Sequence, residues 1–185
     1  MWTREGVGRL TTRWQHSLWI LETHMEDLAG VDLRIRGLGD NRPSPTATNG
    51  GTQHYFGPEI GDLADRVRSR AQWALDEFGG NTVLGDLDRS WAVAYEPGGW
   101  QALHNHARGG TICTVTLNLD TNPSEDTSRG ALHAVLPDTD GSTHLVTMPY
   151  WRGKLTLMEG SIYHGAYPTA ASRRILVFDY AYSLR

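Results

Sequence analysis

The sequence has little cysteine, little excess charge and no long apolar run. Cys113 is the single cysteine among 185 residues, so an internal disulfide framework is excluded and a reducing compartment is favoured. The formal net charge of -4 and the pI near 6.0 argue against a nucleic-acid-binding protein. No apolar run approaches the roughly 20 residues that a membrane helix needs. The first residues, Met-Trp-Thr-Arg-Glu-Gly, lack the apolar segment of a signal peptide. We therefore expect a cytoplasmic protein without membrane or nucleic-acid partners.

The length predicts one domain, residues 1–185, built from two parts. We expect a mixed N-terminal extension over residues 1–82 and a metal-binding core over residues 83–185. The extension contains the clearest predicted helix, residues 58–78. Apolar side chains recur there at three- and four-residue steps, a proline opens the segment, and two glycines follow it.

Two other stretches of the extension are less regular. Residues 40–57 are rich in Gly, Pro, Asn, Ser and Thr, which predicts a long loop. Apolar residues alternate from Leu10 to Ile20, which favours a strand, whereas the segment from Trp19 to Leu28 fits a short helix equally well.

After Gly85 the hydrophobic pattern changes to a period of two, which is typical of strands. The segments with this pattern are Trp91–Tyr95, Ala102–His106, Thr111–Leu119, Ala131–Leu136, Thr143–Met148, Lys154–Met158 and Ile175–Tyr182. Clusters of Gly, Pro, Asn and Asp separate them. Many short strands in series predict a mainly β fold with N-terminal helices, of the sandwich, barrel or jelly-roll type.

Three histidines in this region are candidate metal ligands. His104 and His106 lie two residues apart, so on a strand their side chains share one face. His164 follows in Gly160-Ser-Ile-Tyr-His164 and is the candidate third ligand. Imidazole suits iron, copper, zinc and nickel, and three ligands leave positions open for oxygen and substrate. A bare His-x-His pair is more often structural than metal-binding, but Tyr95-x-Pro-Gly before it, His164 after it and an arginine ten residues further on strengthen the metal-site interpretation.

Polar residues on neighbouring strands are candidate lining residues of the same site. In Thr111–Leu119 one face is apolar, and the other carries Thr116 and Asn118. This mixed face either lines a barrel interior or faces solvent. Tyr95 and Gln101 precede the histidine pair and could reach the same interior. His133, on another predicted strand, is a further polar group whose role is left open.

The sequence resembles the iron(II)/2-oxoglutarate-dependent oxygenases. Trp91–His106 is similar to the strand that leads to their metal site, and Arg152–Pro168 is similar to the segment around their distal histidine. Arg174-Ile-Leu-Val-Phe-Asp looks like the strand whose arginine binds the 2-oxoglutarate carboxylate. The resemblance implies a double-stranded β-helix, a jelly-roll or cupin-like fold. It also implies Fe(II), 2-oxoglutarate and O2 as cofactor and co-substrates, and hydroxylation of a substrate.

Only one of two adjacent arginines can point into such a fold, because neighbouring side chains of a strand face opposite ways. The spacing from His164 in the resembling family favours Arg174 over Arg173 as the residue that holds the co-substrate carboxylate. Arginine suits this role because its planar fork binds carboxylates through two charged hydrogen bonds.

The sequence departs from the family's common motif at His106, where an aspartate or glutamate is usual. Three neutral imidazoles leave a divalent ion with two positive charges, where a carboxylate would leave one. The departure keeps two alternatives open. One is a three-histidine iron dioxygenase that works without 2-oxoglutarate and oxidises or cleaves the ring of a metal-chelating substrate. The other is a non-enzymatic cupin-like binding module. The choice between iron and copper also stays open.

The compact size favours a small-molecule substrate over a protein. The sequence leaves the oligomeric state open, with a homodimer formed through sheet edges as one alternative.

Overall fold

A computed structural model describes residues 11–15, 18–28, 31, 42–43, 48–56, 60–107, 111–138 and 140–185. Within these residues the chain forms one helix longer than a turn, α2 (Gly61–Glu77), and a curled eleven-stranded sheet. The strands are β1 (Thr11–Gln15), β2 (Leu18–His24), β3 (Arg42–Pro43), β4 (Thr48–Tyr55), β5 (Thr82–His104), β6 (Ile112–Asn118), β7 (Leu132–Pro137), β8 (Thr143–Met148), β9 (Lys154–Glu159), β10 (Tyr163–Ala166) and β11 (Arg173–Leu184).

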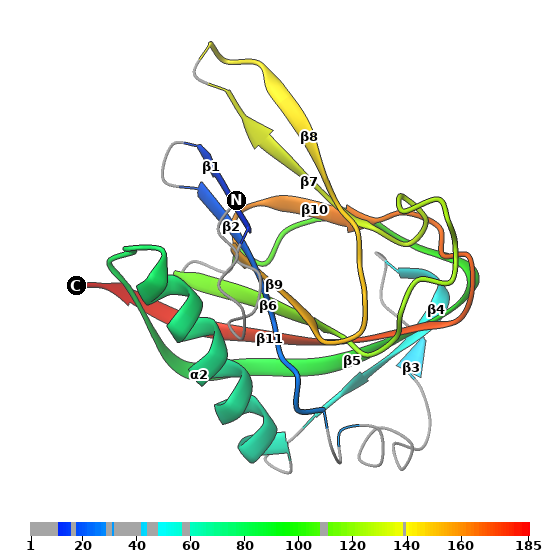
Figure 1. Cartoon of the computed structure of the whole chain (residues 1–185), viewed down its shortest axis with the longest axis horizontal. Coiled ribbons are helices and arrows are strands. Elements are labelled where there is room, and N and C mark those ends of the chain that lie inside the picture. The colour runs from blue at the N-terminus through cyan, green and yellow to red at the C-terminus, as the bar shows by residue number, and fades with distance from the viewer. Residues whose placement is uncertain are drawn as a thin grey trace.

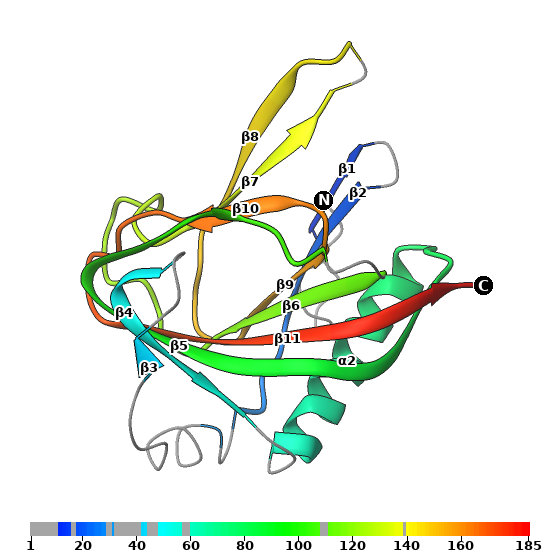
Figure 2. The same ribbon diagram turned by 180° about the vertical axis from the view of Figure 1, so that it is seen from behind.

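The sheet folds back on itself through one long strand. Its order is β1-β2-β9-β6-β11-β5-β10-β7-β8, and β4 adds to β5 and β3 to β4. The first half of β5 pairs with β11, and its last residues pair with β10. The sheet therefore curls into two facing layers, with β9, β6, β11 and β5 below and β10 above (Figures 1 and 2). The hairpin of β7 and β8 projects from the upper layer (Figure 1).

The bend in β5 depends on glycine. Gly98 has a φ of 82°, which L side chains rarely adopt. Gly99 packs against the backbone of β4, where an added Cβ would lie 2.3 Å from the carbonyl oxygen of Gly50. These two residues allow the chain to turn from the lower layer to the upper one. They thereby fix the direction in which His104, at the end of β5, enters the interior.

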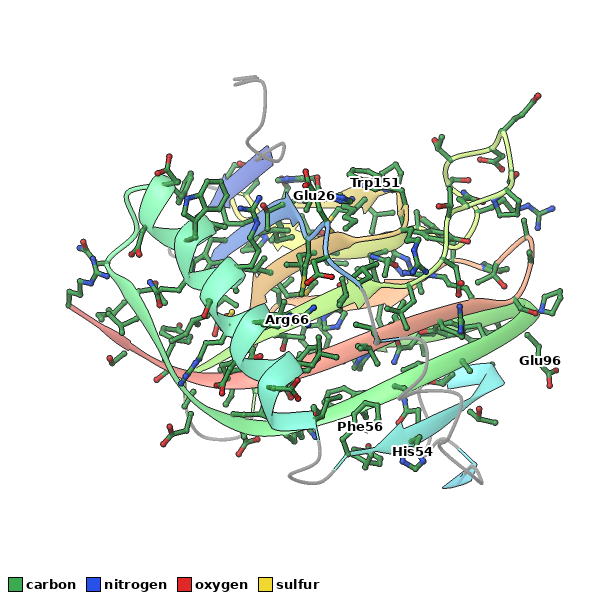
Figure 3. The ribbon with its side chains drawn as sticks, turned by 60° about the horizontal axis from the view of Figure 1, so that its bottom comes forward. Glu26, His54, Phe56, Arg66, Glu96 and Trp151 are labelled. Carbon is green, nitrogen blue, oxygen red and sulfur yellow. The ribbon has the colours of Figure 1, made fainter. Side chains whose placement is uncertain are left out.

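Helix α2 covers the outer face of the lower layer (Figure 1). Its apolar stripe, including Leu63, Val67 and Ala71, is buried against the even-numbered residues Leu176 and Phe178 of β11. The predicted helix over residues 58–78 is thus present, and residues 57–59 lie outside the described residues. On the exposed side of the helix, Arg66 donates to the backbone carbonyl of Asp27 (Figure 3).

Two local predictions differ from the structure, and one alternative that the sequence left open is decided. Residues 48–55, expected in a loop, form β4, because pairing with β5 stabilises a sequence of low strand propensity. Residues 18–24 form a strand that pairs with β9, which excludes the helical alternative for this part of the segment. The short strand β10 was not expected, because its four residues contain no alternating pattern. Leu10 and His16 lie outside the described residues.

The two faces of the lower layer have different environments. Ile175 and Val177 of β11 pack with Trp91, Val93 and Tyr95 of β5 in a separate apolar cluster on the interior side. The polar side chains of β6, Thr114, Thr116 and Asn118, are buried, so the solvent-facing alternative for this strand is excluded. The interior of the curled sheet therefore holds both an apolar wall and several buried polar groups.

Strands from both parts of the chain build this one sheet. β2 and β4, from the N-terminal part, pair with β9 and β5. The division of the chain at residues 82 and 83 stays a prediction. None of the described helices is both long and apolar enough to cross a membrane.

Candidate metal centre

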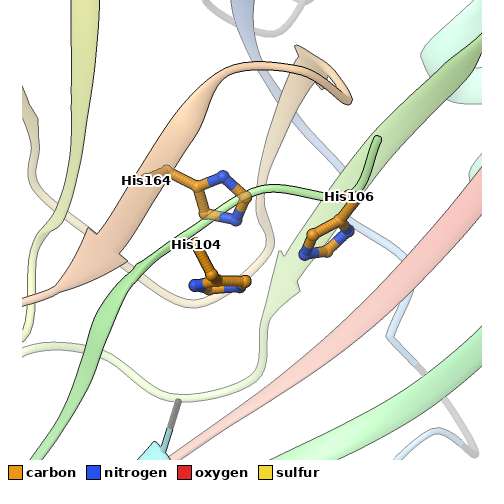
Figure 4. Close-up of side chains that lie close together, drawn as sticks. All are labelled: His104, His106 and His164. Atoms are coloured by element: carbon orange, nitrogen blue, oxygen red, sulfur yellow. The ribbon is translucent and has the colours of Figure 1, made fainter. Parts of the chain in front are cut away.

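The three predicted histidines come together where the end of β5 pairs with β10 (Figure 4). His164 of β10 is the direct cross-strand partner of His104 of β5, so their side chains lie on the same face. His106 follows the end of β5, where its backbone N–H donates to the carbonyl of Gly160. The ring centroids are 4.5 Å apart for His104 and His164, 5.0 Å for His106 and His164, and 5.2 Å for His104 and His106.

The candidate ligand atoms of the three rings lie within 4.8 Å of one another. In each ring the Nδ1 atom already has an acceptor. Nδ1 of His104 lies 2.8 Å from the carbonyl oxygen of Ala102, and that of His164 lies 3.0 Å from the carbonyl oxygen of Ile162. Nδ1 of His106 lies 2.7 Å from Oδ1 of Asp179. If each Nδ1 carries the proton, each Nε2 is left with a free lone pair, which is the tautomer a metal ligand needs.

Burial keeps the imidazole ring of His164 neutral. Desolvation, together with the neighbouring His104 and His106, lowers the pKa of His164 to about 3. Desolvation also lowers the pKa of His104. Protons therefore do not compete with a metal ion for these two rings at neutral pH.

A buried acidic group stands behind His106. Asp179 of β11 is flanked in register by Arg89 of β5 and by Thr114 of β6. Arg89 Nε donates to Asp179 Oδ2 at 2.6 Å, and the Thr114 hydroxyl donates to Asp179 Oδ1 at 2.8 Å. Burial pushes the pKa of Asp179 upward, but the hydrogen bonds from His106 and Thr114 and the charge of Arg89 hold that pKa below its usual value.

No pattern in the sequence predicted a place near the histidines for Asp179, Arg89 or Thr114. A charged residue that follows the apolar run Ile175–Phe178 was the available signal. Its partner could not be read from the sequence, because the pairing of Asp179 with Arg89 spans 90 residues.

The structure distinguishes the two adjacent arginines. Arg174, which the sequence analysis favoured, points away from the interior and binds both carboxylate oxygens of Asp120, with its side chain 30% exposed. Arg173 is 0% exposed and lies on the interior face with Ile175 and Val177. The reason is the alternation of β11, whose even-numbered residues face helix α2.

Two of the predicted lining residues, Asn118 and Tyr95, lie next to Arg173. Its guanidinium donates to Asn118 Oδ1 at 2.7 Å and to the carbonyl of Gly130, and it lies 4.2 Å above the ring of Tyr150. The ring of Tyr95 lies 5.7 Å away, and its hydroxyl donates to Gln101 Oε1 at 3.0 Å. Thr116 is buried on the same face of β6 as Asn118.

Several buried polar atoms of this interior have no hydrogen-bond partner within the described part of the chain. They are Arg173 Nε, the Tyr150 hydroxyl, Thr116 Oγ1 and Trp91 Nε1. Unsatisfied buried polar groups are costly and rare, so these atoms are candidate partners for a bound polar ligand. A dicarboxylate would satisfy such a set of donors around a cation, so the residues present fit 2-oxoglutarate.

Two other residues singled out in the sequence lie apart from the histidine cluster and from the polar groups around Arg173. His133 of β7 is partnered in register with Gly165, the neighbour of His164, so its side chain points to the opposite face. There its ring lies 4.3 Å from that of Tyr167, tilted by 31°. Cys113 is fully buried on the helix-facing side, and burial raises its pKa well above the usual range.

The architecture and the histidine cluster together define a double-stranded β-helix of the type found in 2-oxoglutarate- and iron(II)-dependent oxygenases. The predicted fold class is confirmed. Prolyl-4-hydroxylase from Pseudomonas putida superimposes with a TM-score of 0.59 over 83% of each chain at 21% identity. HygX from Streptomyces hygroscopicus, solved with nickel, 2-oxoglutarate and hygromycin B, has a TM-score of 0.63, covers 88% of this chain and 82% of its own, and is 13% identical.

A prolyl hydroxylase from Trichoplax adhaerens, solved with a peptide fragment, has a TM-score of 0.61 at 19% identity and covers 82% of this chain and 74% of its own. No protein-family model and no curated protein matches the sequence. At these identities the likeness establishes the fold, and the chemistry has to be argued from the residues of this chain.

Proposed function

We propose that this protein is a non-heme iron(II) oxygenase that uses 2-oxoglutarate and O2 to hydroxylate a small molecule. The observation that carries the proposal is the facing of three imidazole rings, His104, His106 and His164, into an interior that also contains the buried Arg173. The solved structures with this fold, including one with nickel and 2-oxoglutarate bound, support the same chemistry.

Arg173, in place of Arg174, is the residue we propose for the co-substrate carboxylate. Among the described residues its hydrogen-bond acceptors are neutral oxygens of Asn118 and Gly130, so its charge is buried without a bonded anion. Such a charge is costly to bury. A carboxylate would supply the missing countercharge through the fork of the guanidinium, including the unpaired Nε. Thr116 and Tyr150 would donate to the remaining carboxylate oxygens, while Tyr95 and Asn118 hold the arginine in place.

His104, His106 and His164 would hold the metal ion through Nε2. A site with three protein ligands would leave positions on the ion open for co-substrate and O2. The bound ion would supply the oxidising chemistry, in which 2-oxoglutarate and O2 become succinate and CO2 while a C–H bond of the substrate becomes C–OH. The residues of the chain bind and orient the reactants and keep water away from the buried interior.

The substrate side of the proposed site is aromatic. The ring of Trp91 lies 5.4 Å from that of His106 and 5.8 Å from that of Tyr55, which is 46% exposed. The buried Nε1 of Trp91 has no partner among the described residues. An organic small molecule with a hydrogen-bond acceptor would suit this wall.

The direct test is anaerobic reconstitution with Fe(II), followed by measurement of O2 uptake and succinate formation with and without 2-oxoglutarate. We expect both signals to require the oxoacid. Binding of 2-oxoglutarate to cobalt-loaded protein, measured by calorimetry, tests the same point without a known substrate. Metal-loaded protein that binds no 2-oxoglutarate would contradict the proposal.

A second candidate is a three-histidine dioxygenase that needs no oxoacid. The absence of a carboxylate from the ligand cluster of the described residues favours it, since three neutral ligands leave the ion with its full charge and suit a chelating, anionic substrate. O2 uptake that depends on a catechol-type substrate, and not on 2-oxoglutarate, would select this candidate.

A further inference from the structure

Asp179 is surrounded by side chains from two neighbouring strands. It lies on the central strand β11, with Arg89 of β5 and Thr114 of β6 as its direct neighbours in register. Both neighbours donate to it, and its side chain is 1% exposed. The carboxylate oxygen Oδ1 accepts from Thr114 and from His106 Nδ1. The histidine that replaces the family's usual carboxylate ligand is therefore the one that has a buried carboxylate behind it.

The position of Asp179 excludes it as a ligand to the same ion. Its Oδ1 contacts Nδ1 of His106, whereas the ion would lie roughly 2 Å beyond Nε2, on the opposite side of the ring. The other two rings have only backbone carbonyl oxygens at Nδ1, those of Ala102 and Ile162. Asp179 thus acts on the site through one ring, His106.

The charge of Asp179 is only partly offset by Arg89. The side chain of Arg89 is 19% exposed and also lies 4.9 Å above the ring of Trp91, so water screens part of its charge. The carboxylate is buried and bonded directly to the ligand ring. At the ion, the nearer and less screened of the two charges has the larger effect.

We propose that Asp179 is a positioning residue that orients His106 and supplies, through its ring, the negative charge that a ligand carboxylate would supply directly. The inference rests on the proposed metal site. It implies that the negative charge at the site comes from Asp179, which bonds to a ligand ring, and not from a carboxylate that binds the ion directly. The ion then keeps a nearby negative charge, while one oxygen ligand is replaced by nitrogen.

The test is the affinity for Co(II), titrated by its visible d–d absorption, in the full-length protein. Asp179→Asn keeps the shape and an acceptor oxygen but removes the charge, and we expect it to weaken binding about 10–100-fold. Thr114→Val is the matched control. The Thr114 hydroxyl donates to Asp179 Oδ1 and also lies 2.8 Å from His106 Nδ1, so the variant perturbs the same ring without changing the charge. We expect a smaller loss than for Asp179→Asn, of no more than about threefold.

A double-mutant cycle separates positioning from general structural support. In the His106→Asp background the ring that links Asp179 to the ion is gone. Asp179→Asn should then change Co(II) affinity by no more than about threefold. Equal losses in both backgrounds would mean that Asp179 only stabilises the fold, and the inference would be wrong.

If Asp179→Asn fails to fold, a second variant can still test the inference. The defect would arise from leaving Arg89 unpaired, so the double variant Arg89→Gln with Asp179→Asn removes both charges. We expect the same loss of Co(II) affinity in it. Wild-type affinity in either folded variant overturns the inference and leaves the proposed function standing, whereas a wild-type protein that takes up no Co(II), Fe(II) or Zn(II) overturns both.

Discussion

His164 lies directly opposite His104 in the antiparallel pairing of β10 and β5, and the two ring centroids are 4.5 Å apart. Two candidate ligands 60 positions apart in the chain are therefore placed by one backbone register. A shift of that register by a single residue would turn one ring to the other face of the sheet.

This register gives the first prediction. His104→Gln and His164→Gln should each lower the affinity for Fe(II) or Co(II) by at least about 100-fold, since each removes one of three ligands. His133→Gln is the control, because His133 lies on the neighbouring strand with its side chain on the opposite face. Metal content after anaerobic loading measures the difference. Equal metal content in His164→Gln and His133→Gln would contradict the assignment.

The second prediction separates the two arginines. Arg173→Gln should weaken 2-oxoglutarate binding to metal-loaded protein at least about tenfold, because each charged hydrogen bond contributes about 1.5–3 kcal/mol. Arg174→Gln should leave it unchanged, since that side chain is bound to Asp120 on the outside. Calorimetry on both variants tests the assignment. If Arg174→Gln weakened binding and Arg173→Gln did not, Arg174 would be the residue that binds the co-substrate carboxylate.

The burial of Arg173 also predicts a stability effect. In ligand-free protein, Arg173→Met should leave the free energy of unfolding unchanged or raise it, because it removes a charge that the described residues meet only with neutral acceptors. Adding 2-oxoglutarate to the metal-loaded protein should stabilise the wild type but not this variant. Urea unfolding with and without the oxoacid measures both. A loss of several kcal/mol in the ligand-free variant would indicate a structural arginine.

Alkaline pH should destabilise the fold through Tyr180. Its buried hydroxyl donates to the carbonyl of Ala64 in α2 at 2.7 Å, and burial raises its pKa. Above the ordinary pKa near 10 the unfolded chain loses this proton while the folded chain keeps it. Stability therefore falls by about 1.4 kcal/mol per pH unit for this group.

Tyr180→Phe is the control for that effect. The variant should lose about 1 kcal/mol at neutral pH, from the missing hydrogen bond, and show a shallower decline above pH 10. Urea unfolding between pH 8 and about 11.5 measures the slope. An identical slope in wild type and variant would mean that Tyr180 titrates normally.

The bend of β5 predicts a sensitive glycine. Gly99→Ala should destabilise the protein by about 1–3 kcal/mol or more, because the new methyl group would meet the backbone of Gly50. It should also lower metal affinity, since the bend directs His104. Gly61→Ala, at the start of α2 with open space around it, should be neutral or stabilising by about 0.4–1 kcal/mol. Thermal unfolding and metal titration of the two variants test the contrast.

The candidate ligands and the fold class could be predicted from the amino-acid sequence alone. His104, His106 and His164 could be identified because their spacing and the flanking motifs are local features, and period-two alternation is visible without coordinates. Helix α2 was equally readable, because its apolar stripe repeats within one segment.

Tertiary structure alone decided which arginine faces inward, which carboxylate supports His106, and that residues 48–55 form a strand. Arg173 and Arg174 are adjacent and chemically identical, so only the packing of α2 against one face of β11 distinguishes them. Asp179 acquires its role from strands that pair across 65 and 90 residues. Strand β4 has little strand propensity of its own and exists because β5 offers it hydrogen bonds. Interactions between distant segments leave no pattern in any one of them.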